Sequence, residues 1–230
     1  MAPRVTERTI RAVDRALAQR YSEKPFRSRG APLDGLIQTI LSQNTTDVNS
    51  GAAFRSLKQR FPTWEQARLA RVGSIARAIE GGGLANIKAQ RIKDILNQLH
   101  GERGETTLDF VCNLGIEEAR EFLESLTGVG PKTAACVLLF NCGRPVIPVD
   151  THVHRVAGRL GWLPEGSTAE RAHQELQELV PDDLIYQLHL NMVAHGRDLC
   201  RPSNPRCPDC PILRWCPFGR ERVRSGDAGA

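Results

Sequence analysis

LTGVGPKTAACVLLF, residues 126–140, is the stretch of sequence that decides the fold. Gly128 and Gly130 have no side chain, so the chain can turn there with positive φ and can approach a ligand closely. Pro131 suits the first position of a helix. The stretch therefore predicts two helices joined by a tight turn, with the amides at the start of the second helix able to hold a phosphate. A turn that binds nothing is the alternative that the glycines leave open.

The rest of the chain continues this helical pattern. Glycines and prolines interrupt it at intervals that leave room for helices, for example at Gly81–Gly83 and Gly161–Gly166. Apolar residues between these interruptions recur at helical spacing, as do Ile92, Ile95 and Leu99. Sustained alternation of apolar and polar residues, which is typical of strands, is scarce. We therefore expect an all-α protein of about ten helices.

The composition is that of a folded protein without membrane spans. Of the 230 residues, 40% are hydrophobic and 25% are charged, which is ordinary for a globular chain. No segment approaches the run of about 20 apolar residues that crosses a bilayer, and the N-terminus has no apolar signal segment. We expect a soluble, cytoplasmic protein with no membrane partner. The net charge of +5 modestly favours a polyanionic partner such as nucleic acid.

Four of the seven cysteines lie close together near the C-terminus, and the other three are scattered. The four follow the pattern C-x6-C-x2-C-x5-C and are Cys200, Cys207, Cys210 and Cys216. In a reducing compartment such a group indicates a metal site rather than disulfides. Four thiolates bind either one zinc ion or a [4Fe–4S] cluster, and the number of ligands does not separate the two.

A second motif, VDTH at residues 149–152, places Asp150 immediately before a helical pattern. Its carboxylate can accept the backbone amides of His152 or Val153, so the residue is a well-placed helix cap. Capping alone would explain an aspartate at this position. His154 lies two residues after His152, so the two rings do not share a helix face and a two-histidine metal site is not expected.

These motifs occur in the same order as in a known family. LTGVGPKTA, VDTH and the four-cysteine spacing together resemble the helix-hairpin-helix DNA glycosylase superfamily that includes endonuclease III, over residues 33–216. The resemblance implies a monomer that binds damaged double-stranded DNA and associates with the bacterial nucleoid. It also implies that the hairpin residues Gly128, Val129 and Gly130 contact the DNA backbone.

The family resemblance also divides the chain. It implies a six-helix barrel domain over residues 25–144 that contains the helix-hairpin-helix element. Residues 1–24 and 145–217 are expected to form a helical domain around a [4Fe–4S] cluster held by the four cysteines. The cluster would fold a loop carrying Arg201 and Arg206 onto DNA. Residues 218–230 are expected to be a basic, disordered tail.

Lys132 lies where the family has its Schiff-base lysine, and Asp150 lies where it has its second catalytic residue. A free lysine has a pKa of about 10.4, so little of it is the neutral amine that can attack carbon. The positive end of the helix dipole disfavours the ammonium form at the second helical position. A surface lysine that contacts phosphate is the alternative. The anionic Asp150 would stabilise the sugar cation that forms as the glycosidic bond breaks.

Two further segments resemble the family's base-flipping turns. In ILSQNTTD, residues 40–47, the residue that enters the emptied base stack is Asn44, with Gln43 adjacent. The family usually has Gln at the Asn44 position. In GGGLANIKAQRI, residues 81–92, Leu84 is the expected wedge opposite the lesion. Ordinary loop chemistry is the alternative for both segments.

The combined reading is a DNA glycosylase that removes oxidised pyrimidines of the thymine glycol type and also cleaves abasic sites. Loss of the base leaves a Schiff base on Lys132, and loss of a C2′ proton then eliminates the 3′ phosphate. Two alternatives stay open. One is a mismatch or other damaged-base glycosylase of the same superfamily, and the other is a non-catalytic DNA-binding module with a four-cysteine metal site.

Overall fold

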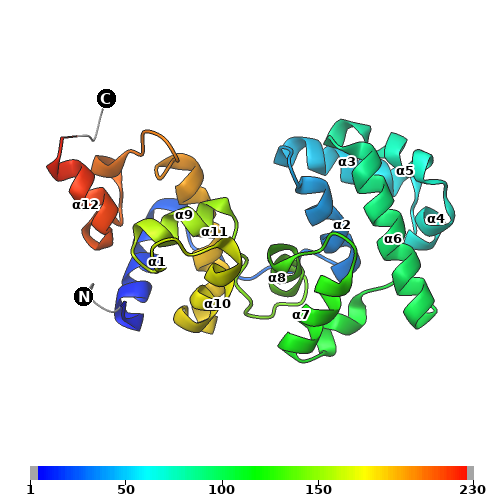
Figure 1. The fold of residues 1–230 in the computed structure, drawn as a ribbon, viewed down its shortest axis with the longest axis horizontal. Helices are drawn as coiled ribbons and strands as arrows, with labels where there is room; N and C mark the ends of the chain where they lie inside the picture. The colour runs from blue at the N-terminus through cyan, green and yellow to red at the C-terminus, as the bar shows by residue number, and fades with distance from the viewer. Residues whose placement is uncertain (1–4, 227–230) are drawn as a thin grey trace. The chain divides into compact units, whose positions relative to one another are not determined.

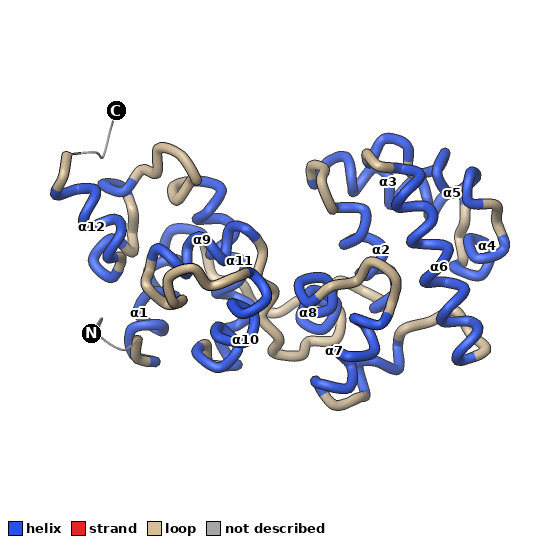
Figure 2. The backbone as a smooth tube through the Cα atoms, viewed as in Figure 1, coloured by secondary structure: helices blue, strands red, loops and turns tan. Residues whose placement is uncertain are grey.

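The computed structural model describes residues 5–226, and every regular element within that range is a helix (Figures 1 and 2). The all-α prediction is therefore confirmed. No helix in this range is both long and apolar enough to cross a membrane. The chain divides into two compact units, one made of Met1–Arg27 with Pro145–Ala230 and the other of Ser28–Arg144. The sequence predicts domain boundaries after residues 24 and 144, whereas the two units divide after Arg27 and Arg144.

The unit of Ser28–Arg144 is built around α8 (Pro131–Phe140), whose residues from Thr133 to Phe140 are all buried. Its apolar sequence, TAACVLLF, fits a helix that is surrounded on every side. The other elements of this unit are α2 (Pro32–Ser42), α3 (Asp47–Arg60), α4 (Trp64–Leu69), α5 (Val72–Ala78), η1 (Glu80–Gly82), α6 (Ala85–Arg103), η2 (Asp109–Asn113) and α7 (Ile116–Ser125).

Helix α2 packs directly against α8 in this unit. Gly35 of α2 faces the side chain of Asn141, and a Cβ atom added at this glycine would lie 2.0 Å from Asn141 Oδ1. The Asn141 amide donates to the carbonyl of Gly30 at 3.1 Å, just before α2 begins. A larger residue than glycine at position 35 would therefore displace the Asn141 amide from its bond to the Gly30 carbonyl.

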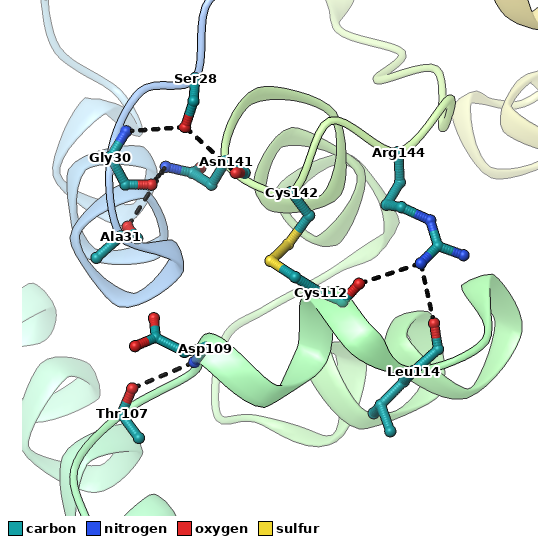
Figure 3. The surroundings of a disulfide bond; sticks show 10 residues. All are labelled: Ser28, Gly30, Ala31, Thr107, Asp109, Cys112, Leu114, Asn141, Cys142 and Arg144. Atoms are coloured by element: carbon teal, nitrogen blue, oxygen red, sulfur yellow. Dashed lines mark hydrogen bonds between the residues drawn. A yellow bond between two sulfur atoms is a disulfide. The ribbon is translucent and has the colours of Figure 1, made fainter.

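A disulfide between Cys112 of η2 and Cys142 joins η2 to the end of α8 (Figure 3). Arg144 supports the same connection, because its Nη1 donates to the carbonyls of Cys112 and Leu114, each at 3.1 Å. A reducing compartment predicts free thiols, and for this pair the structure has a disulfide instead. Cys136 in α8 is buried and forms no disulfide with any described residue.

The other unit packs α1 (Glu7–Tyr21) and α9 (Thr151–Arg159) against α11 (Ile185–Asp198). Gly196 allows the close approach of α9, since a Cβ atom there would lie 2.8 Å from the Cβ of His152. The remaining elements are α10 (Ala169–Leu179), η3 (Asp182–Leu184), η4 (Cys207–Asp209), η5 (Leu213–Trp215) and α12 (Pro217–Arg224).

The expectation that residues 218–230 form a disordered tail is wrong for most of that range, because α12 occupies Pro217–Arg224. Cys216 caps this helix through its sulfur, which accepts from the amide of Gly219 at 3.3 Å. Phe218 anchors it, with the guanidinium of Arg159 4.3 Å from the ring centroid. Residues 227–230 lie outside the described part of the chain.

Candidate functional site

The hairpin that precedes α8 leaves backbone amides available for a ligand. Gly128 has φ of +76°, which an L-residue with a side chain rarely adopts, and Val129 is buried beneath the turn. Gly130 is the N-cap of α8 and Pro131 is its first residue, as the sequence predicts. Within the described residues the amides of Gly130 and Lys132 donate to no other group. A phosphate can accept from such amides.

Lys132 occupies the second position of α8 and is half-buried. Its backbone is fixed because α8 begins at Pro131 and is buried from Thr133 onward. Its Nζ has no hydrogen-bond partner among the described residues, so the amine can reach a bound molecule. The residue belongs to the unit of Ser28–Arg144.

Asp150 is the N-cap of α9, as its position in the sequence predicts. One oxygen, Oδ1, accepts from the amides of His152 at 2.9 Å and Val153 at 2.8 Å. The other oxygen has no hydrogen-bond partner in the described part of the chain. The carboxylate is thus fixed in orientation with one oxygen left for a substrate. Asp150 belongs to the other unit, so its placement is described within that unit.

The segment that leads to Asp150 is held by two side chains that the sequence analysis did not single out. Gln177 of α10 accepts from the amide of Ile147 at 2.9 Å and donates to the carbonyl of Pro145 at 2.8 Å. His189 of α11 is buried, and its Nδ1 lies 2.9 Å from the carbonyl of Pro148. These hydrogen bonds fix the backbone of the extended segment that precedes α9.

Both predicted base-flipping residues have left-handed backbone conformations. Asn44 has φ of +54° in the turn between α2 and α3, and Leu84 has φ of +50° at the start of α6. Asparagine tolerates this conformation, whereas for leucine it costs about 1–2 kcal/mol. The Leu84 side chain is nevertheless 51% exposed. Strained and exposed residues of this kind occur preferentially at ligand-binding sites.

Gln43 and Asn44 differ in how they are held. Gln43 is half-buried, and its Oε1 accepts from Nη1 of Arg91 at 3.0 Å. Asn44 is exposed and its side chain has no hydrogen-bond partner among the described residues. Of the two, Asn44 is therefore the one whose side chain is available for an emptied base stack.

The four clustered cysteines line a single cavity. Its other walls come mostly from α9, α11 and α12 and include Val156, Leu160, Leu199 and Phe218. Cys200 follows the end of α11, Cys207 lies in η4, and Cys216 caps α12. Local chain geometry thus brings all four thiols to one place, as the spacing predicts.

Burial, together with the charges of neighbouring cysteines, disfavours the thiolate forms of Cys207, Cys210 and Cys216. Burial raises the pKa of Cys210 to about 12, and it raises the pKa of Cys207 and Cys216 above the ordinary range. Thiolates would form here only around a positively charged centre. As the side chains stand, no group of three or more His, Cys, Asp or Glu in the described residues could hold a single metal ion.

Several hydrogen-bond donors surround the cysteine sulfurs. Nη1 of Arg159 donates to the sulfur of Cys200 at 3.3 Å, and the amide of Gly219 donates to the sulfur of Cys216 at 3.3 Å. Nε2 of His195 lies 3.6 Å from the sulfur of Cys210. Burial lowers the pKa of His195 to about 4, so its ring is neutral at pH 7. Donors of this kind stabilise sulfur ligands that carry negative charge.

The loop between Cys200 and Cys207 presents both of its arginines to solvent. Arg206 forms an ion pair with Asp198 at 2.6 Å, and Nε of Arg201 donates to the carbonyl of Asp198 at 3.0 Å. Arg206 would have to share its charge between Asp198 and any DNA phosphate.

Comparison with known proteins identifies the family. Residues 37–182 match the HhH-GPD superfamily base excision DNA repair proteins. The chain belongs to this superfamily. The resemblance drawn from the hairpin, VDTH and cysteine motifs is confirmed, and the protein is an enzyme of the base-excision DNA glycosylase class.

Relatives within the HhH-GPD superfamily cover most of the chain. A candidate DNA glycosylase of Arabidopsis thaliana is 45% identical over 190 residues, which are 79% of this chain and 65% of the relative. Endonuclease III of Thermotoga maritima is 35% identical over 191 residues, which are 83% of this chain and 85% of that protein. A solved structure of a trapped endonuclease III–DNA covalent intermediate superposes with a TM-score of 0.79 at 28% identity, covering 96% of this chain and 100% of that chain.

Two basic residues of this HhH-GPD protein were not singled out in the sequence, although both contact the predicted base-flipping turns. Lys88 is fully buried beneath the turns, and Arg91 bonds to Gln43. The signal that could have located Lys88 is its spacing, since it lies on the same helical face as the apolar residues Ile92 and Ile95.

Proposed function

We propose that this HhH-GPD protein releases oxidised pyrimidines such as thymine glycol from duplex DNA and cleaves the resulting abasic site through a Schiff base at Lys132. The observation that carries the proposal is the position of Lys132. It is the second residue of α8, directly after a hairpin whose Gly130 and Lys132 amides have no partner within the described residues. A phosphate on those amides would hold the sugar close to the amine.

The first chemical step forms a bond between Lys132 and the sugar. The neutral Nζ attacks C1′ of the flipped nucleotide while the bond from C1′ to the base breaks. The base leaves with the bonding electrons and takes up a proton. The free oxygen of Asp150 stabilises the positive charge that develops on the sugar.

The second step cleaves the strand. The sugar ring opens and leaves an iminium ion between C1′ and Nζ of Lys132. Removal of a C2′ proton by a base then moves an electron pair toward C3′, and the 3′ phosphate leaves with the pair from its C–O bond. Water finally hydrolyses the imine and frees Lys132.

We propose that Cys200, Cys207, Cys210 and Cys216 bind a [4Fe–4S] cluster. Their common cavity and the donors from Arg159 and the amide of Gly219 fit an anionic group of four thiolates around an iron–sulfur core. When bound, the cluster would tie the segment 199–219 into one folded unit.

Borohydride trapping tests the chemistry. The reductant converts the iminium ion into a stable amine, so duplex DNA with thymine glycol should become covalently attached to the wild-type protein. Lys132→Gln should give no adduct and no strand cleavage, while it still binds the duplex. Mass spectrometry of the wild-type adduct should place the DNA on Lys132.

Parallel substrates separate the possible failures. An adduct on an abasic duplex but not on thymine glycol would retain the lyase and overturn the choice of base. Full strand cleavage by Lys132→Gln would overturn the role of the lysine. No adduct on either duplex, with DNA binding intact, would favour a non-catalytic DNA-binding protein.

A further inference from the structure

Lys88 of α6 is 1% exposed, although a lysine is rarely buried without a specific partner. Its Nζ donates to the carbonyl of Leu41 at 2.7 Å and to the carbonyl of Gly82 at 2.9 Å. These carbonyls stand at the ends of α2 and η1, where helix geometry leaves carbonyl groups without a partner. One ammonium group thus caps two helices at once, at the ends where a positive charge is favoured.

The two carbonyls precede the two candidate base-flipping residues. Leu41 lies three residues before Asn44, and Gly82 lies two residues before Leu84. Both turns contain a non-glycine residue with positive φ, which relaxes unless the surroundings hold it. Lys88 is a side chain that fixes the backbone of both turns to the same helix.

Arg91 lies one turn further along α6 and extends this connection to the hairpin. Its Nη1 donates to Oε1 of Gln43 at 3.0 Å. Its side chain also lies against Gly128, where a Cβ atom would come within 2.8 Å of Arg91 Cδ. The first two turns of α6 therefore contact both base-flipping turns and the DNA-binding hairpin.

We propose that Lys88 and Arg91 are positioning residues for duplex opening, which hold the Asn44 and Leu84 turns and the hairpin in one fixed arrangement. Neither residue touches the DNA in this role. The turns then enter the base stack without first becoming ordered, so less binding energy is lost on opening the duplex. The inference rests on the proposed function, because it assumes that the protein flips its substrate out of a duplex.

Lys93 provides a matched control on the same helix. Its Nζ donates to the carbonyl of Arg68 and, at 2.7 Å, to that of Ala70, so it caps the end of α4 rather than the base-flipping turns. Lys88→Met and Lys93→Met each remove an ammonium group that caps a helix and retain a similar apolar stem. Both should lower the melting temperature, but only Lys88→Met should affect duplex opening.

The experiment compares single-turnover release of thymine glycol from duplexes that differ in the free energy needed to unpair the lesion. With adenine opposite the lesion, Lys88→Met should release the base about ten to a hundred times more slowly than Lys93→Met or the wild type. With an abasic site opposite, the lesion is already unpaired, and most of the difference should disappear. A 2-aminopurine beside the lesion should become fluorescent with the wild type and stay quenched with Lys88→Met.

Arg91→Met gives a second, milder variant that retains the apolar stem, in case Lys88→Met does not fold. It should show the same dependence on the opposite base with a smaller loss of rate. Equal losses for Lys88→Met and Lys93→Met, or losses that do not depend on the opposite base, would overturn the inference. If the wild type neither releases thymine glycol nor unstacks 2-aminopurine, the proposed function itself fails.

Discussion

At the scale of single residues, Asp14 of α1 is a buried carboxyl group with only part of its hydrogen bonding satisfied. It is 3% exposed, and its Oδ2 accepts from Nε2 of Gln187 at 2.7 Å. Its Oδ1 is buried without a partner. Burial accordingly raises the pKa of Asp14 above the ordinary value of an aspartate. The folded protein thus binds a proton at this site more tightly than the unfolded chain does.

Titration of Asp14 makes the stability of the fold depend on pH. Because the pKa of Asp14 is higher in the folded state, its contribution favours folding at low pH and is lost as pH rises through that raised value. Above that raised value the carboxylate is charged, and its burial then destabilises the fold. Asp14→Asn should therefore raise the free energy of unfolding at pH 7 by about 1 kcal/mol, since a neutral amide replaces an unpaired charged oxygen.

Urea denaturation from pH 7 down to about pH 4 checks this prediction. The advantage of Asp14→Asn should shrink as the pH falls, because wild-type Asp14 then becomes protonated and loses its charge. Asp109→Asn serves as the control, since Asp109 is exposed and its substitution should change stability by less than about 0.5 kcal/mol. An advantage that stayed constant over this pH range would show that charge burial is not the cause.

Residue chemistry also explains which functional positions could be predicted. Asp150 was placed as a helix cap because a carboxylate before an apolar helical pattern has few other local roles. Lys88 was missed because a lysine near a helix start is normally exposed, and only the fold brings the Leu41 and Gly82 carbonyls to it. The choice between Gln43 and Asn44 likewise depended on Arg91, a residue 48 positions away.

At the scale of elements, the start of α8 was predictable because Gly130 and Pro131 are local signals for a helix beginning. Helix α12 was not, because its cap is the sulfur of Cys216, which is not a usual capping group, and its arginines resemble a solvated tail. The pairing of Cys112 with Cys142 depends on the packing of η2 against the end of α8, which no local pattern encodes.

The disulfide between Cys112 and Cys142 should stabilise the fold of the unit that carries Lys132. Its cysteines are 30 residues apart, so reduction frees a sizeable loop in the unfolded chain. Loss of the bond should lower the free energy of unfolding by about 2–4 kcal/mol. The Arg144 bonds to Cys112 and Leu114 remain after reduction, so the fold should persist.

Urea unfolding with and without a phosphine reductant measures this effect. The Cys112→Ser/Cys142→Ser double variant should match the reduced wild type and should not respond to reductant. Alkylation before any reduction gives an independent result, because Cys112 and Cys142 should stay unmodified in the native protein. Complete labelling of both residues would contradict the disulfide.

At the scale of the whole molecule, the division into two units predicts that loss of the cluster is a local event. The cavity lined by the four cysteines belongs to one unit, whereas α2 and α8 form the core of the other. Each unit has its own buried apolar residues and can therefore open separately. Removing one cluster ligand should loosen residues 199–219 and leave the core around α8 protected.

Cys210→Ala tests this expectation, with Cys136→Ala as the control, because Cys136 lies in the other unit and forms no disulfide with any described residue. The wild type and Cys136→Ala should be brown and contain four irons per chain, and Cys210→Ala should lose the colour and most of the iron. Hydrogen exchange should then increase across residues 199–219 of Cys210→Ala, but not in α2 or α8. One zinc per chain in the wild type would refute the cluster, and equal loss of protection in both units would refute their independence.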